Sequence, residues 1–278
     1  MTSTATNPEI SRSVKTGVIL TNYQDVGTGD PVLLLHGSGP GVSAYANWRL
    51  TMRDLSPRFR LLAPDLAGFG YSEVPDDSTY SREVWLQQIV DFLDAMGVEK
   101  AHVIGNSFGG SMALALAISH PERVDRIVLM GSVGVPFELT PGLDAVWGYE
   151  PSFEAMRTLM RDTFAYNGSL VTDDLVESRY RASLRTQAAY ESMFPAPRQR
   201  WVDAMAHSEA DIRGIEHPTL MVHGRDDKVI PLATSLTMLE WIDDSRLHVL
   251  GRCGHWTQIE HAASFAELVT GFLTEAEL

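Results

Sequence analysis

The residues best suited to chemistry form the stretch GNSFG (105–109), which has the pattern G-x-S-x-G around Ser107. A predicted strand, residues 101–104, leads into it, and a run of small residues typical of a helix leads out. A serine between a strand and a helix lies on a sharp turn that exposes its hydroxyl, and the flanking glycines leave room for that turn. Ser107 is therefore predicted to be a nucleophile. The alternative is an ordinary strand-to-helix turn with a capping serine.

A serine hydroxyl is a weak nucleophile near neutral pH, so Ser107 needs a base and an acid that orients the base. We predict His255 as the base because it follows a glycine in the loop after the last predicted strand; a structural loop histidine is the alternative. The preceding strand ends in a loop with Asp226 and Asp227. We favour Asp227, since the 28 positions between it and His255 suit one helix and one strand. Asp226 is expected to cap or pair locally.

A glycine-rich turn, HGSGPG (36–41), directly follows the first of the parallel strands that we predict. A backbone N–H of this turn, together with the N–H of Phe108, is expected to form an oxyanion hole beside Ser107. The turn lacks the G-K-[ST] ending of a phosphate-binding loop and the G-x-G-x-x-G pattern of a dinucleotide site. The histidines and carboxylates show no metal-ligand spacing. We expect neither a metal nor a cofactor.

Short aliphatic runs alternate with amphipathic stretches along most of the chain, which predicts an α/β protein with a parallel sheet and crossover helices. The last two runs have the continuous apolar character of strands buried on both faces. Between residues 136 and 206 this rhythm stops and apolar residues recur at helical spacing, which predicts a helical lid. The core would then comprise residues 1–135 and 207–278. The six predicted strands are residues 31–35, 60–63, 101–104, 126–130, 219–222 and 246–250.

The 278 residues include 22 basic and 36 acidic side chains, a formal net charge of −14. With no run of Lys or Arg, this balance argues against nucleic-acid binding, and an anionic ligand would need a local cation. The N-terminus is polar and no stretch of about 20 apolar residues occurs, so we expect neither a signal peptide nor membrane association. A single cysteine, Cys253, rules out an internal disulfide and favours a reducing compartment. A cytoplasmic protein is expected.

Four stretches together resemble the meta-cleavage product hydrolases, carbon–carbon bond hydrolases of bacterial aromatic degradation. They are HGSGPGVSAYANW (36–48), GNSFGG (105–110), FPAPRQRW (194–201) and GRCGHW (251–256). The similarity runs from residue 17 to 272 and is greatest to the branch that contains the 2-hydroxymuconic semialdehyde hydrolases and the toluene and cumene pathway hydrolases. It implies the α/β-hydrolase fold: a mostly parallel twisted sheet flanked by helices, with a helical lid inserted after the sixth core strand.

The resemblance also implies roles for individual residues. The triad would be Ser107, Asp227 and His255, and the oxyanion hole would use the N–H groups of Ser38 and Phe108. Residues expected to hold the substrate's carboxylate and enol end, or to border it, are Gly37, Gly39, Asn47, Asn106, Arg185 and Trp256. An arginine suits a planar carboxylate, although Arg185 could instead be an exposed lid residue, and Trp256 could be only a packing aromatic. The wall around the sixth-carbon substituent is expected to include Val133, Trp147 and Ile230.

The implied substrate is a small 2-hydroxy-6-oxo-hexa-2,4-dienoate-type anion, cleaved to 2-hydroxypenta-2,4-dienoate and a carboxylic acid without a cofactor. His255 would move the proton that ketonises the dienol. Either Ser107 or a water activated by His255 would then attack the sixth carbon. A serine esterase or lactonase on the same fold is one alternative, and a non-catalytic ligand receptor is another. We also expect a homo-oligomer, a dimer or larger.

Overall fold

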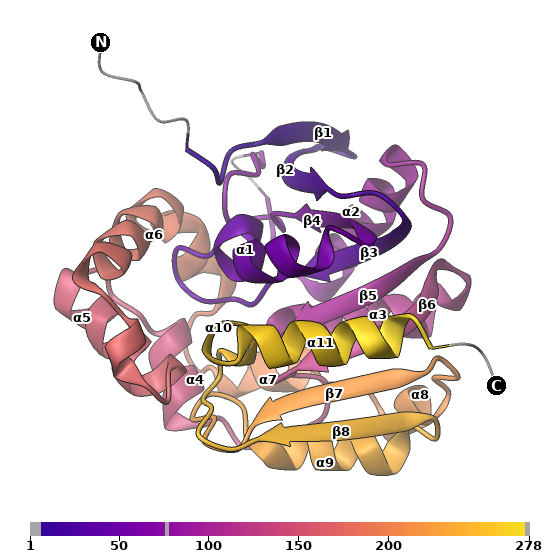
Figure 1. The fold of residues 1–278 in the computed structure, drawn as a ribbon. Helices are drawn as coiled ribbons and strands as arrows, with labels where there is room; N and C mark the ends of the chain where they lie inside the picture. Colours follow the sequence, from indigo (N-terminus) through magenta and orange to yellow (C-terminus); the bar gives the residue numbers. More distant parts are fainter. Residues whose placement is uncertain (1–6, 76–77, 276–278) are drawn as a thin grey trace.

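The computed structural model describes residues 7–75 and 78–275, so residues 1–6 of the polar N-terminal stretch lie outside the described part. Its centre is an eight-stranded sheet with the order β1-β2-β4-β3-β5-β6-β7-β8 (Figure 1). Strands β3 to β8 pair in parallel, whereas β1 and β2 pair antiparallel. The strands are β1 Arg12–Thr16, β2 Ile19–Val26, β3 Asp30–Leu35, β4 Phe59–Pro64, β5 Ala101–Asn106, β6 Val124–Met130, β7 Thr219–Gly224 and β8 Ser245–Leu250. The expected mostly parallel α/β sheet is confirmed.

The six predicted strands correspond to β3 through β8, but β1 and β2 were missed. These two strands mix polar and apolar residues, so they lack the continuous aliphatic run that marks a central parallel strand. The prediction that residues 246–250 are buried on both faces is wrong. Strand β8 is the edge of the sheet, and Arg246, His248 and Val249 are exposed.

Helices cover both faces of the sheet and enclose two apolar clusters. On one face α1 (Ala44–Leu55) and α11 (Ala262–Leu273) pack through residues such as Trp48 and Phe265, with α10 (Thr257–Glu260) beside them. The other cluster includes residues of α2 (Arg82–Ala95), α3 (Phe108–Ser119), α8 (Glu209–Arg213) and α9 (Leu232–Trp241). Serine side chains accept N–H groups at the starts of α1 and α2, which satisfies backbone donors there.

The segment between β6 and β7 is helical, and Figure 1 shows α4, α5 and α6 gathered at one side of the sheet. Its side chains mix Met, Trp, Tyr and Arg at helical spacing, which suits short helices that pack on one another. The elements before α8 are α4 Pro141–Trp147, α5 Phe153–Thr158, the π-helical turn η2 Leu159–Phe164, the 3-10 turn η3 Gly168–Leu170, α6 Asp173–Met193 and α7 Gln199–Met205. The division into a lid, 136–206, and a two-part core, 1–135 and 207–278, stays a proposal.

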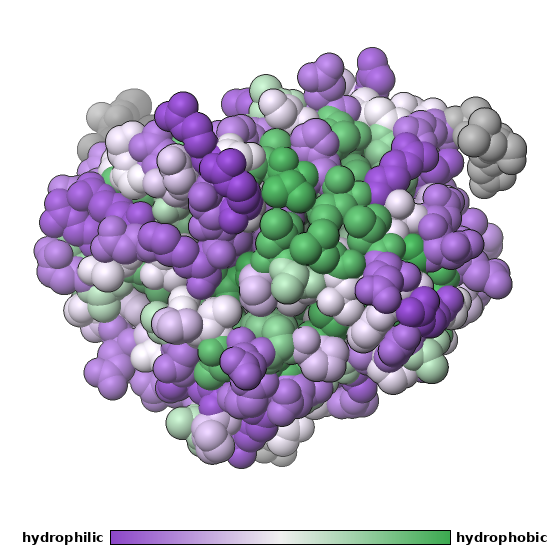
Figure 2. Space-filling model, turned by 90° about the horizontal axis from the view of Figure 1, so that it is seen from below, coloured by the Kyte–Doolittle hydropathy of each residue, from purple (hydrophilic) through white to green (hydrophobic). Residues whose placement is uncertain are grey.

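The lowest face in Figure 1, formed by β8 and α9, carries an apolar area that Figure 2 shows from below. Leu236 and Leu239 of α9 are 51% and 36% exposed, and Val249 of β8 is 40% exposed. An edge strand also leaves backbone groups without a strand partner on its outer side. This face is therefore suited to contact with another protein surface.

Within the part of the chain described, no helix has the length and apolar character needed to cross a membrane.

We predict that Gly109→Ala destabilises the fold. An added Cβ would lie 2.2 Å from the Leu35 carbonyl oxygen, so backbone must move, at an expected cost of about 1–3 kcal/mol in the free energy of unfolding. Gly271→Ala is the matched control, because Gly271 is an exposed position of α11 where the added Cβ would have no other part of the protein within 4 Å. It should stabilise the protein by about 0.5–1 kcal/mol. Denaturant unfolding of the two variants measures both effects; equal stability would contradict the packing argument.

Candidate active site

Ser107 lies on the sharp turn between β5 and α3, as expected from its sequence pattern. Its backbone angles, φ 54° and ψ −115°, are strained for a residue with a side chain. The turn is held because the Ser107 N–H donates to the Met130 carbonyl at 2.8 Å, and its own carbonyl accepts the N–H of Gly110 at 3.0 Å. The structure therefore stabilises a conformation that an isolated serine would avoid.

Asp227 and His255 lie in the loops after β7 and β8, at the same edge of the sheet as Ser107. The His255 Nδ1–H donates to Asp227 Oδ2 at 2.7 Å, which leaves Nε2 as the basic nitrogen. The other Asp227 oxygen accepts the N–H groups of Val229 at 2.7 Å and Ile230 at 3.0 Å. Asp226 instead accepts the backbone N–H of Arg252, as a locally pairing residue would. The geometry supports Asp227 rather than Asp226 as the acid.

The pKa of Asp227 is lowered even though its carboxyl is buried. Burial acts to raise it, but the charge and hydrogen bond of His255 and the proximity of His223 outweigh that effect. His223 is a neighbour that the sequence did not suggest, with its Nε2 3.5 Å from Asp227 Oδ2. Burial lowers the pKa of His223, so at neutral pH its Nε2–H donates to the Ile230 carbonyl at 3.1 Å and it forms no ion pair. Asp227 is thus kept ionised chiefly by His255.

A residue of the helical segment holds the His255 loop. The His255 N–H donates to the Phe164 carbonyl at 2.8 Å, and the Phe164 ring stacks on both His255 and Trp256. Phe164 ends the π-helical turn η2, and such turns are frequent at functional sites. His255, the predicted base, is therefore held from two sides, by Asp227 and by the segment between β6 and β7.

The glycine-rich turn after β3 packs against the nucleophile. A Cβ added to Gly37 would lie 3.5 Å from the Ser107 Cβ. Ser38 is held through its side chain, which accepts from Trp147 Nε1 at 3.0 Å, and through its carbonyl, which accepts from the Tyr190 hydroxyl at 2.9 Å. No protein acceptor takes the Ser38 N–H in residues 7–75 and 78–275.

The second expected oxyanion donor begins a helix. Phe108 is the first residue of α3, so its N–H has no acceptor within that helix. Its ring is fully buried, which leaves only its backbone to serve the site. The two N–H groups of Ser38 and Phe108 are thus available to stabilise an oxyanion, and this role stays a proposal.

A cavity of about 330 Å³ opens beside Ser107, within the size range of small-molecule sites. Asn47 Nδ2 is buried there without a protein partner, so its two N–H donors remain for a ligand. Apolar residues of the wall come mainly from α4, α5, η2 and the loop after β7: Leu143, Val146, Met156, Met160, Phe164 and Val229. The sequence-predicted residues that line this cavity are Gly37, Ser38, Gly39, Asn47, Asn106, Ser107, His255 and Trp256.

The structure does not place the expected wall residues Val133, Trp147 and Ile230 on the cavity surface. All three are buried, but none is among the described residues that line the cavity. Trp147 turns away from the cavity, stacks on Phe194 and donates to Ser38. The residues that precede Trp147 and Ile230 in the chain, Val146 and Val229, line the cavity instead. The sequence located the correct segments but not the direction of each side chain.

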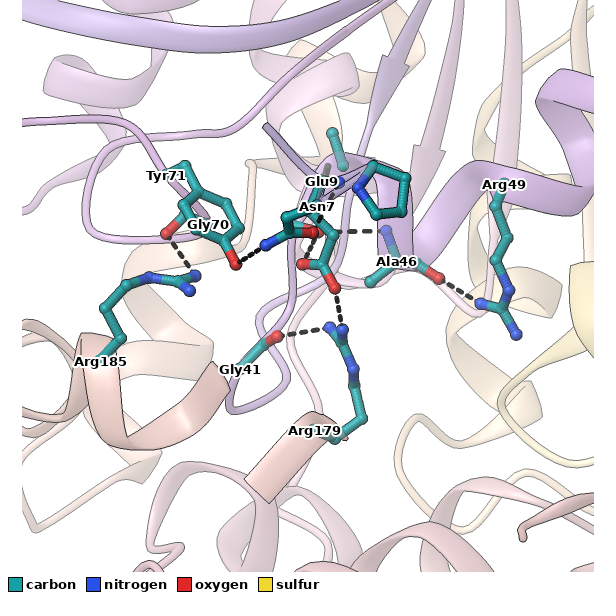
Figure 3. Close-up of polar contacts among 12 residues, drawn as sticks. Asn7, Glu9, Gly41, Ala46, Arg49, Gly70, Tyr71, Arg179 and Arg185 are labelled. Atoms are coloured by element: carbon teal, nitrogen blue, oxygen red, sulfur yellow. Dashed lines mark hydrogen bonds and ion pairs between the residues drawn. The ribbon is translucent and has the colours of Figure 1, made fainter. Parts of the chain in front are cut away.

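Arg185 is likewise not among the described residues that line the cavity, and its expected contact with a substrate carboxylate stays a prediction. It donates to the Gly70 carbonyl at 2.8 Å, and its guanidinium lies 3.5 Å from the centre of the Tyr71 ring (Figure 3). Arg185 lies about 1.7 helical turns of α6 after Arg179, so the two side chains leave the helix in different directions, and Arg179 does line the cavity. Of these two α6 arginines, the structure thus places Arg179 and not Arg185 on the cavity wall.

Three charged residues of the cavity wall were missed: Glu9, Arg49 and Arg179. Burial, followed by the nearby charge of Arg179, lowers the pKa of Arg49, although an arginine remains protonated. The acidic composition had indicated that an anionic ligand would need a local cation, but nothing in the residue spacing distinguished these arginines from the others. Within residues 7–75 and 78–275, no cluster of three potential metal ligands occurs.

The fold and this site define an α/β hydrolase, and a family model described as alpha/beta hydrolase fold matches residues 30–262. The chain is 57% identical to 2-hydroxymuconate semialdehyde hydrolase of Pseudomonas sp. strain CF600, over 100% of this chain and 98% of that relative. It is also 57% identical to 2-hydroxy-6-oxo-2,4-heptadienoate hydrolase of Pseudomonas putida, over 97% of this chain and 98% of that relative. CumD of Pseudomonas fluorescens IP01, in a variant complexed with acetates, is 54% identical, with a TM-score of 0.96 over 98% of this chain and 100% of CumD. The chain belongs to the meta-cleavage product hydrolases.

The structure predicts a pH-dependent contribution of His36 to stability. Burial lowers its pKa to about 4, although the hydrogen bond from Nδ1 to the Gly37 carbonyl at 2.8 Å acts in the opposite direction. The neutral ring accepts the Leu66 N–H at Nε2 at 2.9 Å. Since the unfolded pKa is 6.5, the contribution is complete above pH 6.5 and is lost as the pH falls towards 4. We expect this loss to be about 3 kcal/mol in the free energy of unfolding.

Denaturant unfolding between pH 4 and 7 measures this loss. His36→Gln should flatten the dependence on pH, whereas His248→Gln, exposed on β8, is the matched histidine control. An unchanged slope in His36→Gln would contradict the assignment.

Proposed function

We propose that this protein hydrolyses the carbon–carbon bond of 2-hydroxy-6-oxo-hexa-2,4-dienoate-type ring-cleavage products, including 2-hydroxymuconate semialdehyde. The observation that carries the proposal is a Ser107–His255–Asp227 group beside a cavity that also contains two arginines. A hydrolase of neutral esters has no need of such cations, whereas a dienoate anion does in a protein of net charge −14. The names of the 57% identical relatives support the same reaction.

The substrate carboxylate is proposed to bind near Arg179 and Arg49. A guanidinium has five N–H donors in a planar arrangement, and Arg179 uses Nη1 and Nη2 for one protein acceptor each, which leaves three N–H donors. Asn47 contributes its unpartnered Nδ2 on the same wall. The apolar residues of the other elements then surround the carbon chain.

The reaction is proposed to start with ketonisation. The 2-hydroxyl loses its proton and the fifth carbon gains one, with His255 Nε2 as the group that transfers it. The resulting 2-oxo group makes the bond between the fifth and sixth carbons cleavable, because it can accept the electron pair of that bond. The negative charge of Asp227 stabilises the protonated imidazole while it holds the proton.

Cleavage follows by attack on the keto group at the sixth carbon. Ser107 or a water activated by His255 adds to this carbon, and the N–H groups of Ser38 and Phe108 stabilise the oxyanion. When the oxyanion collapses, the electron pair of the broken bond passes to the dienolate, which is protonated to 2-hydroxypenta-2,4-dienoate. The sixth carbon leaves as a carboxylic acid after one water has been consumed.

A direct test compares the purified protein on 2-hydroxymuconate semialdehyde and on phenyl acetate. We expect kcat/KM to be much higher for the dienoate, whose colour disappears on cleavage. Ser107→Ala should remain folded and lose turnover by about a thousandfold or more, because triad residues act as a unit. Faster hydrolysis of phenyl acetate would instead support the esterase alternative.

The positions of Arg179 and Arg185 relative to the cavity give a second prediction. Arg179→Ala should raise KM for the dienoate about thirtyfold, since a charged hydrogen-bond donor to the carboxylate is lost. Arg179→Lys should restore only part of this, because an ammonium cannot form the planar pair of bonds. Arg185→Ala is the matched control on the same helix and should leave KM within about twofold of the wild type. A raised KM in Arg185→Ala with an unchanged KM in Arg179→Ala would contradict the proposal and support Arg185 as the residue that binds the carboxylate.

The third prediction concerns the substituent on the sixth carbon. Val146 and Val229 are stiff at χ1 and almost fully buried, so the apolar wall should suit hydrogen or methyl better than phenyl. One methylene changes binding by about 0.8 kcal/mol, so the semialdehyde and methyl ketone should differ about fourfold or less in kcat/KM. The phenyl ketone should fall well below both, and Val146→Ala should narrow that gap. A phenyl substrate cleaved equally well would contradict the small pocket.

Association into a dimer or larger homo-oligomer is also proposed, through the face formed by β8 and α9. The open strand edge and the exposed Leu236, Leu239 and Val249 support contact between two copies there.

A cytoplasmic location stays a proposal as well. It is supported by the single, unpaired and buried Cys253.

A further inference from the structure

We infer that Glu9 is a positioning residue of the active site, which holds the Arg179 guanidinium on the cavity wall and thereby sets the affinity for the substrate carboxylate. The inference rests on the proposed function and extends it to a residue outside the glycine turn and the triad. Glu9 precedes β1 by only a few residues, far in sequence from α6, yet its side chain pairs with Arg179 (Figure 3).

The Glu9 carboxylate joins three parts of the structure. One oxygen accepts from Arg179 Nη2 of α6, and the other accepts from the Ser43 hydroxyl at 2.7 Å. Ser43 is the residue that caps α1, because its Oγ also accepts the Ala46 N–H at 3.1 Å. Arg179 Nη1 in turn donates to the Gly41 carbonyl at 2.7 Å. The guanidinium is thus fixed at two nitrogens against the start of α1 and the glycine turn.

Glu9 is itself rigidly held, so it is suited to position a partner. Its backbone N–H donates to the Asn7 side chain at 3.0 Å, and its carbonyl accepts from Asn22 at 2.9 Å and from Gln24 at 3.4 Å. Only 9% of the residue is exposed. A carboxylate with these contacts cannot swing aside easily, and a buried carboxylate is stable only when it is paired.

The local charge explains why an acid is tolerated at an anion site. Glu9, Arg49 and Arg179 all line the cavity, so one carboxylate lies beside two guanidinium groups and one positive charge is left. Without Glu9 the two arginines would repel each other, as the effect of Arg179 on the pKa of Arg49 indicates. Arg179 can still bind a substrate carboxylate while it is paired with Glu9, because three of its N–H donors remain. The negative charge of Glu9 therefore weakens the electrostatic attraction of the site for the substrate carboxylate. In return, Glu9 fixes the position of the Arg179 guanidinium that binds it.

A second contact strengthens the same connection. Asn7 donates to the Tyr71 hydroxyl, and the Tyr71 ring lies under the Arg185 guanidinium of α6 (Figure 3). Residues 7–9 also line the cavity themselves. The segment Asn7–Glu9 is therefore a wall of the active site that contacts α6 directly through Glu9 and Arg179. Its connection to Arg185 is indirect, through Tyr71, and lies outside the cavity lining.

The test measures binding of sorbate, a dienoate anion that the enzyme cannot cleave, by calorimetry, together with KM and kcat for 2-hydroxymuconate semialdehyde. Glu9→Ala should raise the Kd of sorbate and the KM about tenfold, while kcat changes by about twofold or less. Glu9→Gln keeps an acceptor for Arg179 and should stay within about threefold of the wild type. Glu177→Gln is the matched control, because Glu177 pairs with Arg181 on the exposed side of the same helix.

The decisive measurement is Glu9→Ala in an Arg179→Ala background. If Glu9 acts through Arg179, the double variant should bind sorbate as the Arg179→Ala variant does. An equal tenfold loss in both backgrounds, tighter binding in Glu9→Ala, or a lower Tm with unchanged Kd would each overturn the inference. So would cleavage of the semialdehyde by a wild-type protein that does not bind sorbate. Sorbate binding that depends on Glu9 in a protein that cleaves no dienoate would refute the proposed function alone.

Discussion

The backbone turn at Ser107 is the constraint on which the rest of the structure depends. A serine with positive φ is held there only because β5, β6 and α3 pack without side chains at Gly105, Gly109 and Gly110, where an added Cβ would collide with neighbouring atoms. The same close packing brings the glycine turn after β3 against Ser107. The parallel strands then deliver Asp227 and His255 to the same edge of the sheet. The site is thus a consequence of how closely the sheet and α3 can approach.

Electrostatics divides the site into two regions with different means of keeping charges buried. Around the triad, Asp227 remains ionised because His255 and backbone N–H groups satisfy it. On the α1 and α6 side, Glu9 and Arg179 satisfy each other. In both regions a buried charge has a hydrogen-bonded partner, which makes burial tolerable. The protein can therefore be strongly acidic overall and still present cations to an anionic substrate.

The sequence predicted the core sheet, and it predicted a triad whose acid and base lie in contact in the structure, because these features depend on local patterns. A strand, a tight glycine turn and a small-residue helix are recognisable around Ser107, and Asp227 and His255 follow later strands at a suitable spacing. The details of the cavity wall depend on side-chain direction, which a helix changes by about 100° with each residue. This is why Val146 lines the cavity where Trp147 was expected, and Arg179 where Arg185 was expected. Glu9 could not be found at all, since its partner lies 170 positions away.

The contact between Phe164 and His255 has a consequence for protein engineering. The helices between β6 and β7 resemble an exchangeable module, since they form one continuous insertion between two adjacent strands. Yet the carbonyl that fixes the base comes from within this insertion, and a Cβ on Gly254 would lie 2.4 Å from it. A chimaera that receives these helices from another hydrolase would have to reproduce the end of η2 to within a few tenths of an ångström. Exchange of these helices would then change substrate specificity and turnover together, because the same segment lines the cavity and holds His255.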